Sequence, residues 1–162
     1  MPEEVVSDTS PIQYLHQAGC LDLLAALYGS IVIPEAVAEE LAEGIKLGVS
    51  LPDLESIPWI QTQAAPHQVI LPMVVDLGPG ESEVLAMTAD RPGTLALLDD
   101  GLARHFARRL EIRCTGTLGI LLKAKQEGHL KTVSPTIQRL EELGFRLDST
   151  TKATVLRLAD ET

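Results

Sequence analysis

Aromatic and cysteine side chains are scarce in this chain of 162 residues. Aromatic residues make up only 3%, so the core must be built from Leu, Val, Ile and Ala. Their scarcity argues against a protein that binds single strands by stacking bases on aromatic rings. The two cysteines, Cys20 and Cys114, lie far apart and form no CxxC motif. Neither a disulfide scaffold nor a cysteine-based metal site is therefore indicated.

Long apolar runs are also missing. No stretch approaches 18 uninterrupted apolar residues, so we expect no membrane span. The first ten residues are acidic and lack the basic and apolar regions of a secretory signal. These features predict a cytoplasmic protein. Hydrophobic residues make up 45% of the chain, enough for it to fold as a single domain over residues 1–162.

Basic residues are nearly absent from the first hundred positions. That part contains 16 acidic residues and only two bases, Lys46 and Arg91, a formal charge of −14. Residues 101–162 contain 11 bases and 7 acids, a formal charge of +4. Such an asymmetry between the two parts of a chain suggests an anionic partner for the basic part, although a generally acidic protein is the simpler interpretation.

Strand-like and helix-like segments alternate along the chain. Ser10, Thr117, Ser134 and Ser149 are typical residues for the start of a helix, and glycines follow most of the helices. Buried strands are predicted at residues 5–6, 31–33, 59–61, 94–98 and 112–114, and helices at 10–19, 21–28, 34–43, 81–90, 102–110, 117–127, 134–144 and 149–159. Loops should flank the strand at 59–61 throughout residues 46–80. Apolar strands alternating with helices predict an α/β fold with a parallel sheet covered on both faces.

Aspartates follow two of the predicted strands. Asp8 comes after residues 5–6, and the pair Asp99–Asp100 comes after residues 94–98. Sites in open parallel sheets form outside the carboxyl ends of the strands. We expect Ser10 to cap the first helix, so that Asp8 is not needed as a cap and can take part in a site. One aspartate of the pair is expected to cap the next helix while the other faces the crevice.

Two glutamates are predicted to point inward from helices. At about 100° per residue, Glu40 borders the apolar stripe of its helix and Glu81 lies within one. Glu39, Glu43 and Glu83 fall on the solvated faces. Buried carboxylates need a counter-charge, and few bases are available nearby. Oxygen ligands without His or Cys favour Mg²⁺ or Mn²⁺ over zinc.

The helix at 102–110 has one strongly basic face. Arg104, Arg108 and Arg109 lie on it, opposite an apolar face, and the helix begins directly after Asp99–Asp100. These arginines are predicted to bind nucleic-acid phosphates beside the cation, the alternative being an ordinary solvated face.

Taken in order, these motifs resemble the PIN-domain family of metal-dependent nucleases, in particular its branch of uncharacterised members predicted to bind nucleic acid. The matching residues are 5–10, Glu40 before Leu41, Glu81 at the start of a helix, and 97–100 after a central strand. The resemblance covers about residues 4–130 and leaves 131–162 as a helical extension. It implies a three-layer αβα sandwich with a parallel sheet of four to five strands.

The resemblance also implies an activity. The protein would be an endoribonuclease that uses Mg²⁺ or Mn²⁺ to hydrolyse single-stranded RNA, often as the toxin of a toxin–antitoxin pair. Its implied partners are a small antitoxin and a second copy of the chain. The implied catalytic residues are Asp8, Glu40, Glu81 and Asp99. The implied metal ligands are Asp8, Glu81, Asp99 and Asp100, the last as a substitute for Asp99. The hydroxyl of Thr9 or Ser10 would hydrogen-bond the first acid, Asp8, and Ser10 would also contact the nucleic acid.

Two other functions remain open. The chain could be an inactive PIN-like scaffold that binds nucleic acid or protein, which its acidity and its extension favour. Alternatively, Asp8 could carry an aspartyl-phosphate, although residue 10 is serine and not the aspartate that dehalogenase-type enzymes place there.

Overall fold

The strands form one parallel sheet in the computed structural model, which describes residue 2, residues 4–66 and residues 77–162. Their order in the sheet is β3-β2-β1-β4-β5, and every neighbouring pair is parallel. The strands are β1 (Glu4–Ser7), β2 (Ile31–Pro34), β3 (Ile60–Gln63), β4 (Thr94–Leu97) and β5 (Arg113–Thr115). The prediction of a parallel sheet of four to five strands is confirmed.

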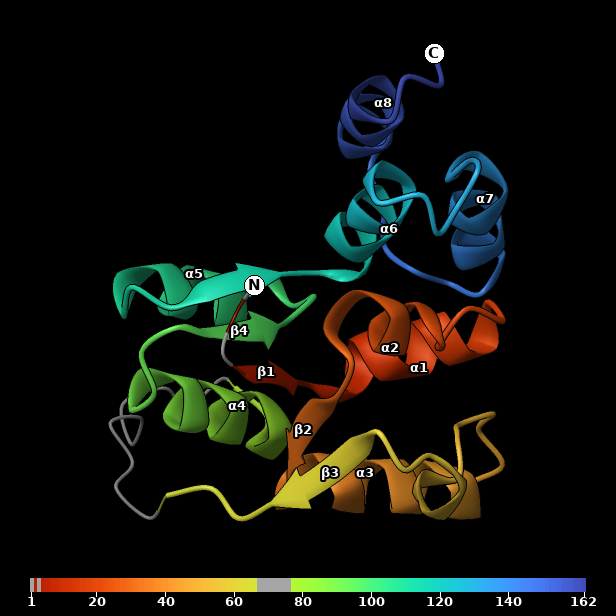
Figure 1. Cartoon of the computed structure of the whole chain (residues 1–162). Coiled ribbons are helices and arrows are strands. Elements are labelled where there is room, and N and C mark those ends of the chain that lie inside the picture. The colour runs from red at the N-terminus through yellow and green to blue at the C-terminus, as the bar shows by residue number, and fades with distance from the viewer. Residues whose placement is uncertain (1, 3, 67–76) are drawn as a thin grey trace.

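Helices flank this sheet and complete the predicted sandwich (Figure 1). In that view, α7 and α8 lie at the end of the molecule opposite to β3 and α3. Within the described residues, no helix is both long and apolar enough to cross a membrane. The helices are α1 (Thr9–Gln17), α2 (Leu23–Tyr28), α3 (Glu35–Lys46), α4 (Pro79–Ala89), α5 (Gly101–Arg109), α6 (Thr117–Gln126), α7 (Ser134–Glu142) and α8 (Ser149–Leu158), with a short 3-10 turn at Leu54–Ser56.

The burial of the strands explains their composition. All four residues of β2 and of β4 are buried, and β1 is buried from its second residue onward. Residues buried on both faces of a parallel sheet are apolar without alternation, as in Ile31, Val32 and Ile33. The edge strands β3 and β5 are more exposed and more polar. Part of the loop predicted after β3 falls on residues 67–76, outside the described residues.

All four of the predicted serine and threonine helix caps are wrong. The cap positions are occupied by Asp8, Gly116, Val133 and Asp148, where we expected Ser10, Thr117, Ser134 and Ser149. Asp148 is a true cap, since its Oδ1 accepts a hydrogen bond from the Thr151 amide at 2.7 Å. The short hydroxyl side chains that favour capping are equally suited to hydrogen-bonding a carboxylate, which is what Ser10 and Thr117 do.

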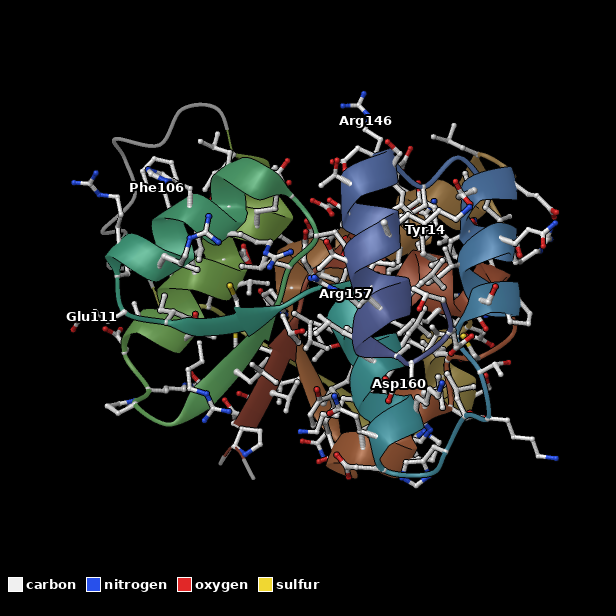
Figure 2. The ribbon with its side chains drawn as sticks, turned by 90° about the horizontal axis from the view of Figure 1, so that it is seen from above. Tyr14, Phe106, Glu111, Arg146, Arg157 and Asp160 are labelled. Atoms are coloured by element: carbon white, nitrogen blue, oxygen red, sulfur yellow. The ribbon has the colours of Figure 1, made fainter. Side chains whose placement is uncertain are left out.

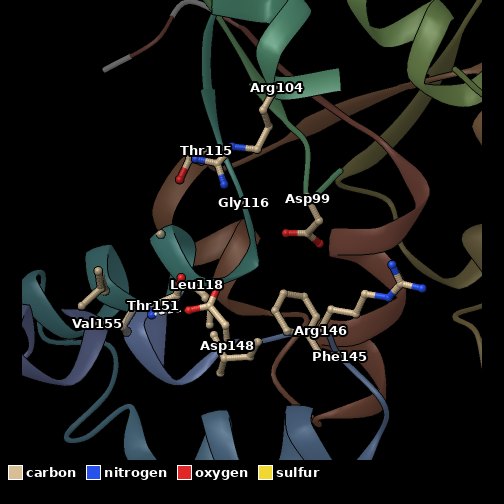
Figure 3. Close-up of a pocket in the computed structure, with 13 residues that line it drawn as sticks. Asp99, Arg104, Thr115, Gly116, Leu118, Phe145, Arg146, Asp148, Thr151 and Val155 are labelled. Atoms are coloured by element: carbon tan, nitrogen blue, oxygen red, sulfur yellow. Dashed lines mark hydrogen bonds between the residues drawn. The ribbon is translucent and has the colours of Figure 1, made fainter. Parts of the chain in front are cut away.

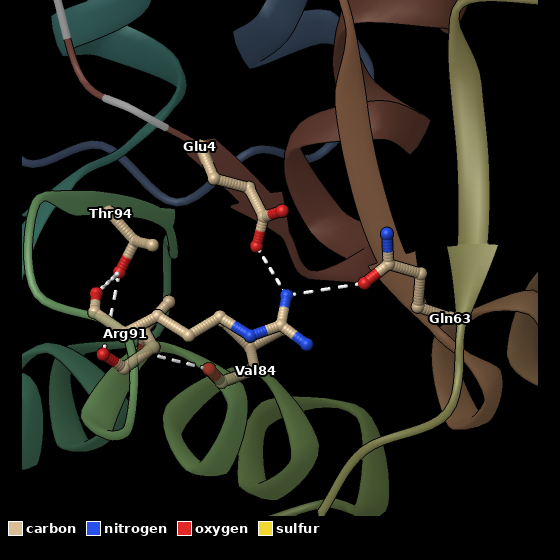
Figure 4. Close-up of polar contacts among 6 residues, drawn as sticks. Glu4, Gln63, Val84, Arg91 and Thr94 are labelled. Carbon is tan, nitrogen blue, oxygen red and sulfur yellow. Dashed lines mark hydrogen bonds and ion pairs between the residues drawn. The ribbon is translucent and has the colours of Figure 1, made fainter.

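One of the two bases in the acidic part of the chain has a structural role. Arg91 lies between α4 and β4, and its Nη1 contacts Glu4 on β1 and, at 3.2 Å, the side-chain oxygen of Gln63 on β3 (Figure 4). The hydroxyl of Thr94 also donates to the Arg91 carbonyl, at 2.8 Å. Arg91 thus links segments far apart in the sequence.

Glu161 attaches the C-terminal helices to the rest of the fold. Its carboxylate accepts hydrogen bonds from the amides of Val133, at 2.8 Å, and Ser134, at 3.1 Å, where α7 begins. It also pairs with Lys125 on α6 at 2.9 Å. A carboxylate at the start of a helix satisfies amides that have no partner within the helix. This contact fixes α7 and the end of the chain on α6.

Candidate functional site

Asp8 and Asp99 lie next to each other at the carboxyl edge of the sheet. They follow β1 and β4, which are adjacent strands with Ser7 paired to Leu97. The Asp8 amide donates to the Leu97 carbonyl at 3.0 Å, which extends the ladder by one residue. Asp8 is only 6% exposed. The topology of the sheet therefore brings together two carboxylates that are 91 positions apart in the sequence.

Asp99 is held by three donors. One of them is Ser10, so the expectation that the Thr9 or Ser10 hydroxyl hydrogen-bonds Asp8 is wrong: the Ser10 hydroxyl donates to Asp99 and the Thr9 hydroxyl to Glu40. The Ser10 hydroxyl donates to Oδ2 at 2.9 Å, and Thr117 donates its amide to Oδ1 and its hydroxyl to Oδ2, both at 2.7 Å. Gly116 lets the Asp99 carboxylate lie this close to the backbone before α6, because a Cβ at position 116 would be 2.7 Å from Oδ1. Charge-assisted hydrogen bonds of this kind fix the orientation of the carboxylate.

Glu40 is held against the start of α4. Its Oε1 accepts a hydrogen bond from the Gly80 amide at 3.1 Å, and its Oε2 accepts one from the Thr9 hydroxyl. A Cβ on Gly80 would lie 2.9 Å from both Glu40 oxygens and 2.9 Å from Oδ1 of Asp8. Only glycine lets both carboxylates contact this helix N-terminus, whose dipole favours negative charge.

Asp100 and Glu81 form a second acidic pair. Oδ2 of Asp100 accepts a hydrogen bond from the Ala103 amide at 2.9 Å and caps α5. Burial raises the pKa of Glu81 to about 7, and the charge of Asp100, the charge of Glu40 and a hydrogen bond with Asp100 act in the same direction. The neighbouring aspartates Asp99 and Asp100 therefore have different partners. Asp99 is bound by Ser10 and Thr117, while Asp100 caps α5 beside Glu81.

The ionised form of Asp8 is unfavourable in this structure. Burial is the main reason that its pKa rises to about 7. A hydrogen bond from the Thr9 amide acts in the opposite direction, and the charges of Glu81, Glu40 and Asp99 raise the pKa further. A carboxyl group whose pKa is raised close to 7 by burial and by neighbouring carboxylates is typical of functional sites and of cation sites.

These acids surround one cavity of about 360 Å³. Asp8, Glu81, Asp99 and Asp100 line it, together with Ser10 and residues 144–146 of the loop between α7 and α8. Glu40 is not among the described residues that line it, but it contacts Gly80 beside Asp8. Of the five acids proposed from the sequence, four line one cavity, and the fifth, Glu40, is bound to Gly80 and Thr9.

The donors in this cavity suit a hard dication by their chemistry. They are carboxylate and hydroxyl oxygens, which Mg²⁺ and Mn²⁺ prefer. Among the described residues, no three acidic, histidine or cysteine side chains are already close enough to share one ion. A coordination shell would require these carboxylates to turn further toward one another.

The predicted basic residues divide into two groups. Arg104 lines a neighbouring cavity together with Asp99. Arg108 and Arg109 are exposed in the last turn of α5 and line neither of these two cavities. Only Arg104, among these three, is next to the carboxylates.

One glutamate assigned to a solvated face is bound instead. Glu83 is half-buried, and its Oε1 accepts a hydrogen bond from the Ala36 amide at 3.1 Å, at the start of α3. The helical projection was wrong here because it considered α4 alone, whereas α3 packs against that helix. Glu39 and Glu43 are exposed, as predicted.

Sequence reasoning missed two residues of the site. The sequence predicts Thr117 to be a helix cap, and none of the predicted site motifs includes Arg146. The only sequence signal for Thr117 was a hydroxyl residue directly after a strand and a glycine. Arg146 carries no local signal, because it reaches the cavity through the packing of the C-terminal helices.

A family model described as a PIN domain matches residues 4–161, nearly the whole chain and including α7 and α8. The fold and the acidic cavity at the carboxyl edge of its sheet agree with that match, and the chain belongs to the PIN-domain family. PIN domains are typically nucleases that use divalent metal ions. No curated protein and no solved structure matches the chain significantly.

Proposed function

We propose that this protein is a metal-dependent endoribonuclease that hydrolyses phosphodiester bonds of single-stranded RNA. The observation that carries the proposal is the convergence of Asp8, Glu81, Asp99 and Asp100 on one cavity. Family membership supports nuclease activity in general, and the basic composition after residue 100 supports an anionic substrate.

In the proposed site, Asp8, Glu81 and Asp99 hold Mg²⁺ or Mn²⁺, and Asp100 is available as a further ligand. A bound ion of this kind supplies a water of lowered pKa and neutralises charge that develops on the phosphate. Glu40 either joins the ligands or orients the attacking water.

Other residues position these acids. Ser10 and Thr117 keep the Asp99 carboxylate in place, and Thr9 and Gly80 do the same for Glu40. Partners that orient metal ligands in this way commonly affect metal affinity as strongly as some ligands do. Arg104, Arg108 and Arg109 contact the phosphates of the strand.

The biological setting is also part of the proposal. We propose a cytoplasmic toxin that a small antitoxin protein neutralises, and a homodimer as its working form. We further propose one domain over residues 1–162, with a core of about 4–130. The branch of the family that the motifs resemble is the support for the toxin role.

A cleavage assay tests the activity. A labelled single-stranded RNA is incubated with the protein and Mg²⁺, with and without EDTA, and the products are separated on a gel. We expect Asp8→Asn to abolish cleavage and Glu39→Gln, a change on the exposed side of α3, to leave the rate unchanged. Cleavage by Asp8→Asn at the parental rate contradicts the proposal.

A second function is favoured by one observation. Because no three of the described acidic side chains already form a shared ion site, the chain also suits an inactive PIN-like module that binds nucleic acid or protein. The two functions differ in metal binding. An inactive module would give no carboxylate-dependent heat on titration with Mn²⁺.

A further inference from the structure

A second cavity, of about 300 Å³, adjoins the carboxylate cavity. Asp99, Phe145 and Arg146 line both cavities, so the two lie side by side with Asp99 between them. Arg104 lines the second cavity from α5, and Arg146 borders both cavities from the loop between α7 and α8. In Figure 3, the guanidinium groups of Arg104 and Arg146 lie on opposite sides of Asp99, and no contact between them and its carboxylate is drawn.

Arg104 lines the second cavity, and the Nε nitrogen of its guanidinium has no partner in the described part of the chain. Its Nε is buried and has no hydrogen-bond partner among the described residues. Its Nη1 would lie 3.5 Å from a Cβ on Gly116, which puts the guanidinium beside the backbone that binds Asp99. A buried donor without a partner is unfavourable, and a bound water, ion or ligand beside the guanidinium would account for it.

Arg146 is presented by a loop that is fixed on both sides. The ring of Phe145 packs edge-on against Tyr14 of α1, with centroids 5.0 Å apart, and the Phe145 amide donates to the Leu140 carbonyl at 2.9 Å. On the other side, Asp148 caps α8. Arg146 itself is exposed, and Figure 2 shows its side chain extending outward beside the start of α8.

Neither guanidinium serves as the counter-charge of Asp99. In the part of the chain that the structure describes, neither Arg104 nor Arg146 forms an ion pair. The oxygens of Asp99 are already engaged by Ser10 and Thr117. The two arginines are therefore free to bind an external anion.

We infer that Arg146 and Arg104 bind the phosphates of a single RNA strand on the two sides of Asp99. This inference rests on the proposed ribonuclease function. It makes the C-terminal extension part of the substrate site, because Arg146 belongs to it. Guanidinium groups bind phosphate through two parallel hydrogen bonds, and this geometry distinguishes them from the point charge of lysine. The phosphate between the two arginines is thereby held over the carboxylates.

The test compares Arg146→Ala with Arg157→Ala, a change of an exposed arginine on α8 that lines neither cavity. Binding of a short fluorescent oligouridine is measured by anisotropy in EDTA at several salt concentrations. We expect Arg146→Ala to weaken binding about tenfold. It should also reduce the slope of log affinity against log salt by about 0.7, the contribution of one phosphate contact to a single strand. Arg157→Ala should change neither quantity.

Two further measurements separate this inference from the proposed function. Arg146→Lys should restore only part of the affinity, because lysine lacks the planar fork. Mn²⁺ titrations of wild type and Arg146→Ala should agree within a factor of two, since Arg146 is not a ligand. Thermal melts should also agree, because the side chain is exposed.

Each contrary outcome has a distinct meaning. If the wild type binds Mn²⁺ and cleaves RNA while Arg146→Ala binds RNA like Arg157→Ala, this inference alone is wrong. If Arg146→Ala binds Mn²⁺ more tightly and RNA equally well, Arg146 is a counter-ion of the carboxylates and the inference is again wrong. A wild type that neither binds Mn²⁺ nor cleaves RNA contradicts the proposed function itself.

Discussion

Replacing Asp8 by asparagine should stabilise the metal-free protein above neutral pH. Burial, together with three neighbouring carboxylates, raises the pKa of Asp8 from 3.8 to about 7. A folded-state pKa above the unfolded value means that the folded protein binds more protons between these two values. Stability of the wild type therefore falls as the pH rises from about 4 to 7, and the loss is complete above 7.

The size of the effect follows from the shift. Each pKa unit corresponds to about 1.4 kcal/mol, so a shift of roughly three units makes the ionised Asp8 unfavourable by about 4 kcal/mol. Asparagine has nearly the same shape and no charge, and its amide can donate to the surrounding carboxylates. Asp8→Asn should thus increase the free energy of unfolding at pH 8 by about 2 to 4 kcal/mol, and the gain should vanish near pH 4.

Urea denaturation in EDTA provides the assay. The fluorescence of Trp59, the single tryptophan, reports unfolding, and both proteins are titrated at a series of pH values from 4 to 8. The matched control is Asp22→Asn, a change of an exposed aspartate before α2, which should show no pH-dependent gain. If Asp8→Asn is no more stable than the wild type at pH 8, or if its gain does not change with pH, our account of the cavity's electrostatics is refuted.

Three further changes test individual contacts. Gly80→Ala places a methyl group 2.9 Å from oxygens of Asp8 and Glu40, and calorimetry should show Mn²⁺ binding weakened by about 10-fold with the fold retained in circular dichroism. Thr117→Val removes a hydroxyl that donates to Asp99 at 2.7 Å, and urea titration should show a loss of about 1.5 kcal/mol. Glu161→Gln weakens the attachment of α7 to α6, and a thermal melt should show a melting temperature lower by about 3 °C. The control Glu142→Gln, on the exposed side of α7, should leave the melting temperature unchanged.

Local patterns were sufficient to predict most of the fold. Apolar runs such as Ile31–Pro34 and Thr94–Leu97 are short, buried and bounded by turn residues, and their positions along the chain determine the alternation of strands and helices. Asp8 and Asp99 could be placed at the sheet edge for the same reason, since Asp8 directly follows β1 and Asp99 lies two positions after the end of β4. Projection on a helix was enough for Glu40, which contacts Gly80 on the neighbouring helix.

Contacts between distant segments were not predictable in this way. Ser10 and Thr117 lie 89 and 18 positions from Asp99, and nothing in their immediate sequence distinguishes a cap from a partner of that carboxylate. Glu83 likewise binds an amide 47 positions away. Arg146 depends on how Phe145 packs against Tyr14, which is a consequence of the whole tertiary arrangement.

Calorimetric titration with Mn²⁺ tests most directly whether the converging carboxylates form a metal site. We predict saturable binding to the wild type and to Glu39→Gln, and loss of that binding in Asp8→Asn and in Asp99→Asn, each checked for folding by circular dichroism. A wild type that binds no Mn²⁺, or folded Asp8→Asn and Asp99→Asn proteins that bind it as tightly as the wild type, would contradict the assignment of this cavity as the metal centre of a nuclease.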